Sequence, residues 1–111
     1  MKRYTQEEIN KLITIEDNIK YIKNVNFDNC DLSNLDLSFI KFIDCSFKGA
    51  YLVRANLEVA NLEGADLYSA NLEGANLEGA YLYNANLEGA KFKRKGLKGI
   101  LDKIISILKG E

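Results

Sequence analysis

The chain has 111 residues, of which 47% are hydrophobic, and its net charge is −1. This is the size of one domain with an adequate core, and the balanced charge excludes a general electrostatic attraction to nucleic acid or to membranes. Histidine is absent. Because histidine is the commonest general acid–base group and the commonest metal ligand, we expect neither a metal nor a cofactor.

The cysteines and the apolar segments bear on the cellular compartment. Cys30 and Cys45 lie fifteen residues apart, without the C-x-x-C spacing of zinc and redox sites. No apolar stretch approaches the ~20 residues of a membrane span. The basic residues near the start are not followed by the apolar run of a secretion signal. We therefore expect a cytoplasmic protein in a reducing compartment.

Residues 1–24 are predicted to form an N-terminal cap with a short helix over about residues 6–13. Thr5 precedes Glu8 by three positions, which is the spacing of a capping box. Apolar residues follow at helical spacing, namely Ile9, Leu12 and Ile13.

Fourteen consecutive five-residue blocks fill residues 25–94. In each block the first and third residues are apolar and the second is polar, which is the alternation of a strand with one buried face. The last two residues are often Glu-Gly, Tyr-Asn or Lys-Gly, and glycine and asparagine favour turns. Each block is therefore predicted to be a three-residue strand followed by a corner, with the first and third residues pointing inward.

A helix is the alternative for these blocks, because alanine, leucine and glutamate favour helices. A step of five residues turns about 500° around a helix, so the leucines would spiral around it instead of forming one stripe. We therefore prefer the strand-and-corner interpretation.

The tandem A-(N/D)-L-x-x pattern over residues 25–94 resembles the pentapeptide-repeat family. The resemblance implies an all-β solenoid, a right-handed quadrilateral β-helix with four blocks and twenty residues per coil. The third residue of each block would fill the centre and the first would lie beside it. Seventy residues would then make about 3.5 coils, a rod about 17 Å tall at ~4.8 Å per stacked strand.

The first blocks depart from this pattern, since their first position is not alanine but Val25, Cys30, Leu35, Ile40 and Cys45. We expect the first coil to be wider or less regular than the others. Residues 20–24 are a candidate extra block, with Ile22 in phase but Lys20 where a small residue is expected.

Residues 95–111 are predicted to form an amphipathic helix that caps the other end. Its six large apolar residues recur at helical spacing and are Leu97, Ile100, Leu101, Ile104, Ile105 and Leu108. We expect this stripe to cover the end of its own solenoid, and pairing with a second copy in a homodimer is compatible with that use. Membrane binding is disfavoured, because the polar face carries only three lysines and no aromatic anchor.

Acidic residues recur at the fourth position of the blocks, at Glu58, Glu63, Glu73, Glu78 and Glu88. Some members of the family that the chain resembles act on DNA gyrase by imitating DNA, so a DNA-mimicking modulator of a type II topoisomerase is the alternative function. The repeats carry ten acidic and six basic residues, a net charge of −4. Because duplex DNA carries about ten charges over ~17 Å, we prefer an ordinary solvated surface. The basic residues 91–95 are better explained as a guard against strand addition than as a nucleic-acid site.

A candidate partner surface lies around two tyrosines that flank Leu82 and are predicted to point outward, where exposed aromatic residues are typical of interfaces. This candidate surface consists of Tyr81, Tyr83, Glu63, Glu58 and Glu78. The partner would be a protein of unknown identity. A catalytic site would need a pocket with convergent polar groups, which a filled rod lacks. We therefore predict a non-enzymatic structural or protein-interaction rod.

Overall fold

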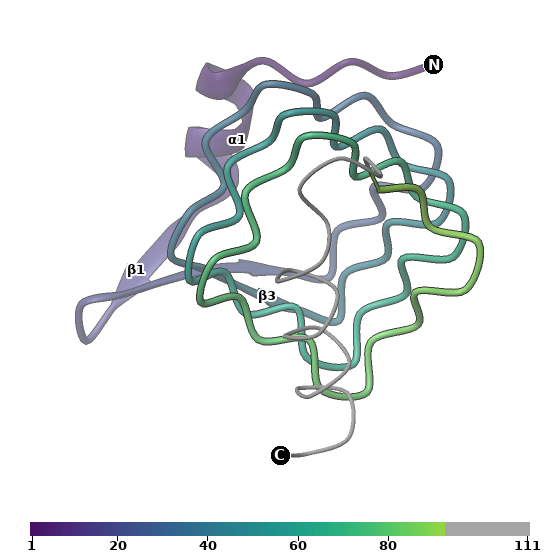
Figure 1. The fold of residues 1–111 in the computed structure, drawn as a ribbon. Helices are drawn as coiled ribbons and strands as arrows, with labels where there is room; N and C mark the ends of the chain where they lie inside the picture. Colours follow the sequence, from purple (N-terminus) through teal and green to yellow (C-terminus); the bar gives the residue numbers. More distant parts are fainter. Residues whose placement is uncertain (93–111) are drawn as a thin grey trace.

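The computed structural model describes residues 1–92, which form a stack of square coils preceded by a helix and a hairpin (Figure 1). The regular elements are α1 (Gln6–Leu12), β1 (Thr14–Glu16), β2 (Ile19–Lys23) and β3 (Ile40–Ile43). Strand β2 lies between the other two strands, antiparallel to β1 and parallel to β3. The helix predicted for residues 95–111 lies outside the described residues.

The coils stack in steps of twenty residues. Parallel bridges connect the second position of each block to the same position twenty residues away, as Asn56 connects to Asp36 and to Asn76. The Asn56 N–H donates to the carbonyl of Leu35 at 2.9 Å, and the Leu57 N–H donates to the carbonyl of Asn76 at 2.8 Å. Four five-residue blocks therefore complete one coil, as the resemblance implies.

The stack has four sides, numbered here in chain order. The first side holds residues 25–29, 45–49, 65–69 and 85–89, the second holds 30–34, 50–54 and 70–74, the third holds 35–39, 55–59 and 75–79, and the fourth holds 20–24, 40–44, 60–64 and 80–84.

The stack begins at residue 20, one block before the predicted start of the repeats. Lys20 pairs with Ile40 and Ile22 pairs with Phe42, in the same twenty-residue register as the later coils. Ile22 is fully buried. Lys20, which occupies the position of the later alanines, is exposed.

The interior is filled by apolar side chains throughout residues 1–92, where no polar or charged residue is buried. Phe27 stacks on Phe47 with ring centres 5.2 Å apart, and Phe42 meets both rings edge-on. Leucine follows at the third position in the next coils, and Ala60 and Ala70 at the first position are fully buried. The first and third residues thus point inward, as the block pattern predicts.

The corners depend on a positive φ at the fifth residue of every block from Asn24 to Gly89. The N–H of the next residue donates back to the carbonyl of the third residue, as Ala60 does to Leu57 at 3.0 Å. Positive φ at only the second central residue defines a type II turn. In nine blocks the second-position Asn or Asp closes the corner further, as Asn56 Oδ1 does by accepting the Glu58 N–H at 3.0 Å.

The corner pattern is interrupted between residues 35 and 45. The corner bond forms at Cys30 and from Ala50 onward, whereas Leu35, Ile40 and Cys45 do not make it. Strand β3 lies in this stretch and extends over four residues instead of forming a single bridge. The first-position side chains of Leu35 and Ile40 are larger than alanine, which is consistent with the open corner at these two residues.

The N-terminal segment covers three of the four strand edges of the first coil. On the second side, the Tyr4 N–H donates to the Asp31 carbonyl at 3.0 Å. On the third side, the Gln6 side-chain amide donates to the Asp36 carbonyl and accepts the Asp36 N–H, at 3.0 and 2.8 Å. On the fourth side, β1 pairs with β2. Open strand edges invite pairing with other chains, and these contacts occupy them.

Helix α1 is held by both local and tertiary contacts. The Glu8 N–H donates to Thr5 Oγ1 at 3.1 Å and the Thr5 N–H donates to Glu8 Oε1 at 3.0 Å, which completes the predicted capping box. Ile9 is fully buried, and the Tyr4 ring lies edge-on to Phe27 at 5.2 Å. Because a helix of this length is unstable alone in water, these apolar contacts hold it on the stack.

Replacing a first-position alanine with leucine should destabilise the fold. Ala60 has no exposed surface, so Ala60→Leu overpacks the coil and should lower the free energy of unfolding by ~1–3 kcal/mol. The control Asn61→Asp, at the next residue, keeps the acceptor for the Glu63 N–H. It should change the free energy of unfolding by less than ~0.5 kcal/mol. Urea denaturation measures both, and equal midpoints would contradict the inward orientation of Ala60.

Removing a second-position amide should open a corner. Asn56→Ala removes the acceptor of the Glu58 N–H and should cost ~0.5–1.5 kcal/mol, whereas Asn56→Asp should be nearly neutral. Thermal melting of the two variants tests this difference. If Asn56→Ala melts at the same temperature as the wild type, the side-chain hydrogen bond does not stabilise the corner.

Candidate interaction surface

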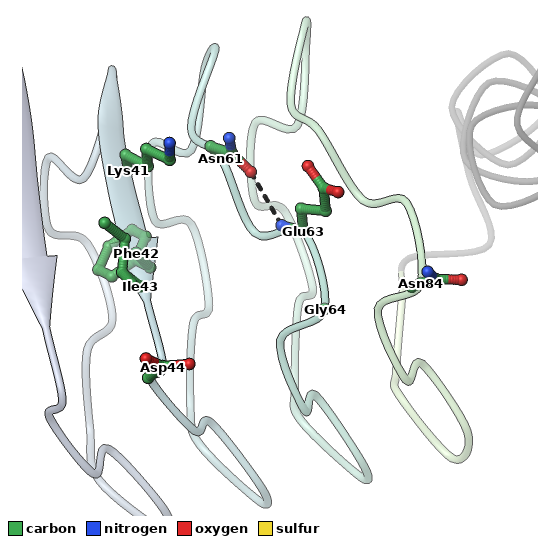
Figure 2. Close-up of a pocket in the computed structure, with 8 residues that line it drawn as sticks. All are labelled: Lys41, Phe42, Ile43, Asp44, Asn61, Glu63, Gly64 and Asn84. Atoms are coloured by element: carbon green, nitrogen blue, oxygen red, sulfur yellow. Dashed lines mark hydrogen bonds between the residues drawn. The ribbon is translucent and has the colours of Figure 1, made fainter.

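The surface of the fourth side has a shallow depression of about 300 Å³, lined by residues of three successive coils (Figure 2). The hollow exists partly because Gly64 has no side chain, and a Cβ added there would meet nothing within 4 Å. Lys41, Glu63 and Asn84 lie around the depression on different coils and do not converge on one point (Figure 2). The depression therefore lacks the convergent polar groups of a catalytic pocket.

Two exposed tyrosines mark the same side at its C-terminal end. Tyr81 is 57% exposed and Tyr83 is 44% exposed, and Tyr81 pairs with Asn61 in the preceding coil. Glu63 lies twenty residues before Tyr83, on the same side. The structure therefore brings Tyr81, Tyr83 and Glu63 together.

The other two acids of the candidate surface, Glu58 and Glu78, lie on the third side, around a corner from the tyrosines. The remaining repeat acids are divided as well, with Glu73 on the second side and Glu88 on the first. The acidic residues therefore form no single stripe along the stack.

Two groups, one at the edge of the fourth side and one on it, have no counterpart in the sequence-based prediction. One is an apolar corner, defined as Ile19, Phe39 and Val59, where the third side meets the fourth. These side chains are 44%, 56% and 36% exposed. Phe39 and Val59 have φ of 61° and 54°, a conformation that a bulky or β-branched residue rarely adopts. In the sequence, this apolar corner is indicated by a large apolar residue at the fifth position of a block, where Gly and Asn are usual.

The other group surrounds Tyr21 on β2. The Lys23 ammonium lies 5.1 Å from the centre of the Tyr21 ring, and the Lys41 ammonium lies 6.0 Å from it. These are cation–π distances. The N-terminal half of the fourth side is therefore basic and aromatic, while the C-terminal half carries Glu63 and the two tyrosines.

Among the titratable groups with altered pKa values, Asp31 and Asp36 belong to the corners and Cys30 and Cys45 to the core. The pKa of Asp36 lies below its ordinary value because the Ser38 hydroxyl and backbone N–H donate to the carboxylate. The pKa of Asp31 is lowered in the same way by Ser33, mainly through its backbone N–H. Burial raises the pKa of the Cys45 thiol, which makes it less reactive. None of these groups faces a cavity suited to catalysis.

The described residues have neither of two features that would suggest another class of protein. Within residues 1–92, no group of three or more Cys, Asp or Glu side chains is arranged to hold a metal ion. In the same part of the chain, no helix has the length and apolar character needed to cross a membrane.

The lowered pKa of Asp36 predicts a pH dependence of stability. A carboxylate whose pKa is lowered by folding stabilises the fold above its ordinary pKa of 3.8, and this contribution is lost as the pH falls through the lowered value. Asp36→Asn keeps an acceptor for the Ser38 N–H but does not titrate. Between pH 5 and pH 3, the melting temperature of the variant should fall less than that of the wild type. An equal fall in the melting temperatures of both proteins would contradict a stabilising role of the Asp36 carboxylate.

Comparison with known proteins agrees with the geometry. A family model described as a pentapeptide repeat region matches residues 20–100, and its match begins where the stack begins. A search of curated proteins finds no match.

Three solved structures of pentapeptide repeat proteins are similar to this chain. One, from the thylakoid lumen of Arabidopsis thaliana, is 28% identical over 62% of this chain, with a TM-score of 0.60, and this chain covers 48%, about half, of its length. Another, from Nostoc PCC 7120, is 33% identical, with 66% of this chain and 76% of that one covered and a TM-score of 0.31. A third, from the cyanobacterium Cyanothece 51142, is 30% identical over 67% and 57% of the chains, with a TM-score of 0.20. The family match over residues 20–100 and the twenty-residue stacking of the five-residue blocks together show that the chain belongs to the pentapeptide repeat family.

Proposed function

We propose that this chain is a non-enzymatic rod that acts by presenting its fourth side to a protein partner. The observation that carries the proposal is the contrast between a filled interior and an aromatic surface. Throughout residues 1–92 the buried residues are apolar, which leaves no room for a substrate. The fourth side, by contrast, exposes Tyr81 and Tyr83 together with the apolar corner. Tyrosine and phenylalanine are enriched at protein interfaces, where they give a large contact area.

The distribution of the acids supports this function over the imitation of DNA. A DNA mimic must present a dense line of negative charge, since duplex DNA carries one charge per ~1.7 Å. In this stack the acids are divided among four sides, and Asp66 lies 3.6 Å from the Lys48 ammonium. A partner that approaches one side therefore meets at most a few carboxylates.

Two further features of the chain belong to the same proposal. Contacts of residues 2–16 with the first coil support a closed N-terminal end, and the amphipathic stripe predicted for residues 95–111 would close the other. Both described cysteines are free and buried, which supports a reducing compartment such as the cytoplasm.

Site-directed photocrosslinking in cells tests the proposed partner surface. The photoreactive residue p-benzoylphenylalanine is placed at Tyr83 on the fourth side and, as a matched control, at Tyr68 on the first side. The two tyrosines are similarly exposed, at 44% and 47%, so each replacement exchanges one accessible aromatic residue for another. We expect a discrete crosslinked species from Tyr83 and none from Tyr68. Equal crosslinking from both positions, or none from either, would overturn the proposal.

A topoisomerase assay tests the alternative function. We expect the protein, at concentrations stoichiometric with gyrase, neither to inhibit supercoiling nor to relieve inhibition by a quinolone, because its acids form no continuous stripe. Gel-based supercoiling of plasmid DNA measures both effects. Relief of quinolone inhibition would favour the DNA-mimicking function instead.

A further inference from the structure

Two bulky apolar residues occupy corners at which their backbone is strained. Phe39 and Val59 have positive φ, in the region that L-residues with large side chains avoid. At the other described corners of the stack this position holds Gly, Asn, Asp, Ser or Arg. Phe39 and Val59 stand one coil apart on the same corner and remain partly exposed. Folding of the single chain does not explain them, because their apolar surface is not covered.

The fourth side divides into two unlike halves along the axis of the stack. The first half carries Tyr21 with Lys23 and Lys41 close to its ring. The second half carries Glu63, Tyr81 and Tyr83. Cations bind the faces of aromatic rings, so each half offers what the other can bind. One copy cannot bring its two halves together, because they lie on different coils of a rigid stack.

Two copies can bring the halves together if their fourth sides meet in opposite directions. A two-fold axis parallel to the strands reverses the order of the coils, so residues 20–24 of one copy meet residues 80–84 of the other. Phe39 then lies opposite Val59 of the second copy, and Tyr21 lies opposite Tyr81. Lys23 faces Tyr83 in the same arrangement. Lys41 faces Asn61, Ile43 faces Glu63, and no like charges oppose each other.

The other arrangement that keeps the coils level is disfavoured. A two-fold axis parallel to the stack reverses the strands instead of the coils, so the leading corner of one copy meets the trailing corner of the other. Phe39 would then lie against the charged side chain of Asp44, and Ile19 against Asn24. The apolar corner would then lie against polar side chains, whereas the antiparallel arrangement places Phe39 against Val59.

We infer that this chain forms an antiparallel homodimer through its fourth side, with the apolar corner at one edge of the interface and the lysine–tyrosine contacts across it. An interface of this kind is isologous, since each copy contributes the same surface. The inference rests on the proposed function, because it names a second copy as the partner of the fourth side.

Sedimentation of the full chain over a range of concentrations tests the dimer. The variant Phe39→Asn/Val59→Asn places a residue that tolerates positive φ at both corners. Its monomer should be at least as heat-stable as the wild type, while the dissociation constant of the dimer should rise by about tenfold or more. The control Ser69→Asn changes a fifth position with similar φ on the first side and should leave the dissociation constant unchanged.

A charge exchange tests the orientation. Tyr83→Lys places an ammonium opposite Lys23 of the second copy and should weaken the dimer by about tenfold or more. Adding Lys23→Glu should restore the affinity to within about threefold, because the two positions face each other only in the antiparallel arrangement. A dimer that Tyr83→Lys weakens and Lys23→Glu does not restore would overturn the orientation.

The outcomes separate this inference from the proposed function. A wild-type protein that stays monomeric at all concentrations, or a dimer that Phe39→Asn/Val59→Asn leaves intact, would overturn the homodimer. Crosslinking from Tyr83 to a different protein would in that case still support a partner surface on the fourth side. Crosslinking from Tyr83 only to a second copy of this chain, together with a concentration-dependent dimer in solution, would support the homodimer and remove the separate partner.

Discussion

The positive φ of the fifth residue is the constraint on which the described stack depends. From Asn24 to Gly89 this angle lies between 53° and 72°, whatever residue occupies the position. It turns the chain at the corner, and at most corners the next N–H donates to the carbonyl of the third residue in a type II turn. Three extended residues followed by a two-residue corner give the period of five. Because each corner directs the first and third residues to the same side, every coil contributes apolar side chains to one continuous interior.

The same constraint explains which positions vary. The second residue is often Asn or Asp because its side-chain oxygen accepts the N–H of the fourth residue, a bond that most other side chains cannot make. The fourth residue contributes only its backbone to this bond, so its side chain is free to differ. Serine, valine, glutamate, lysine and tyrosine all occur there. The surface at the fourth position is therefore chemically varied, and Tyr83 and most of the acids discussed above lie there.

Much of the fold could be predicted from the sequence, because its causes are local. The alternation within each block is enough to assign Leu57 and Ala60 to the interior, and the Thr5–Glu8 spacing is enough to locate the start of α1. The number of sides could not be derived in this way, since a period of five is compatible with other polygons, and it came from the family resemblance. The contact of Gln6 with the stack could not be predicted from the sequence either. A side-chain amide that replaces a strand at the Asp36 edge depends on where the helix comes to rest.

The candidate surface was less predictable than the core for a related reason. Grouping Glu58 and Glu78 with the tyrosines followed their equivalent place within the block, whereas contact on a surface depends on the side to which a block belongs. The apolar corner joins Phe39 and Val59, which lie twenty residues apart, so no pattern within a single block connects them. A surface of this kind is visible only when positions are compared along a column of the stack as well as within a block.

Stacking in steps of twenty has a consequence for how such a chain can change its length. Inserting or duplicating one five-residue block leaves the interior intact, because every block fills the centre in the same way, but it rotates all later blocks by a quarter turn. Tyr81 and Tyr83 would move around the rod to an adjoining side, away from the lysines near Tyr21. Inserting four blocks restores the alignment and lengthens the rod by one coil. A chain of this design can therefore reassign its surface chemistry through changes in block number alone, with no substitution in the core.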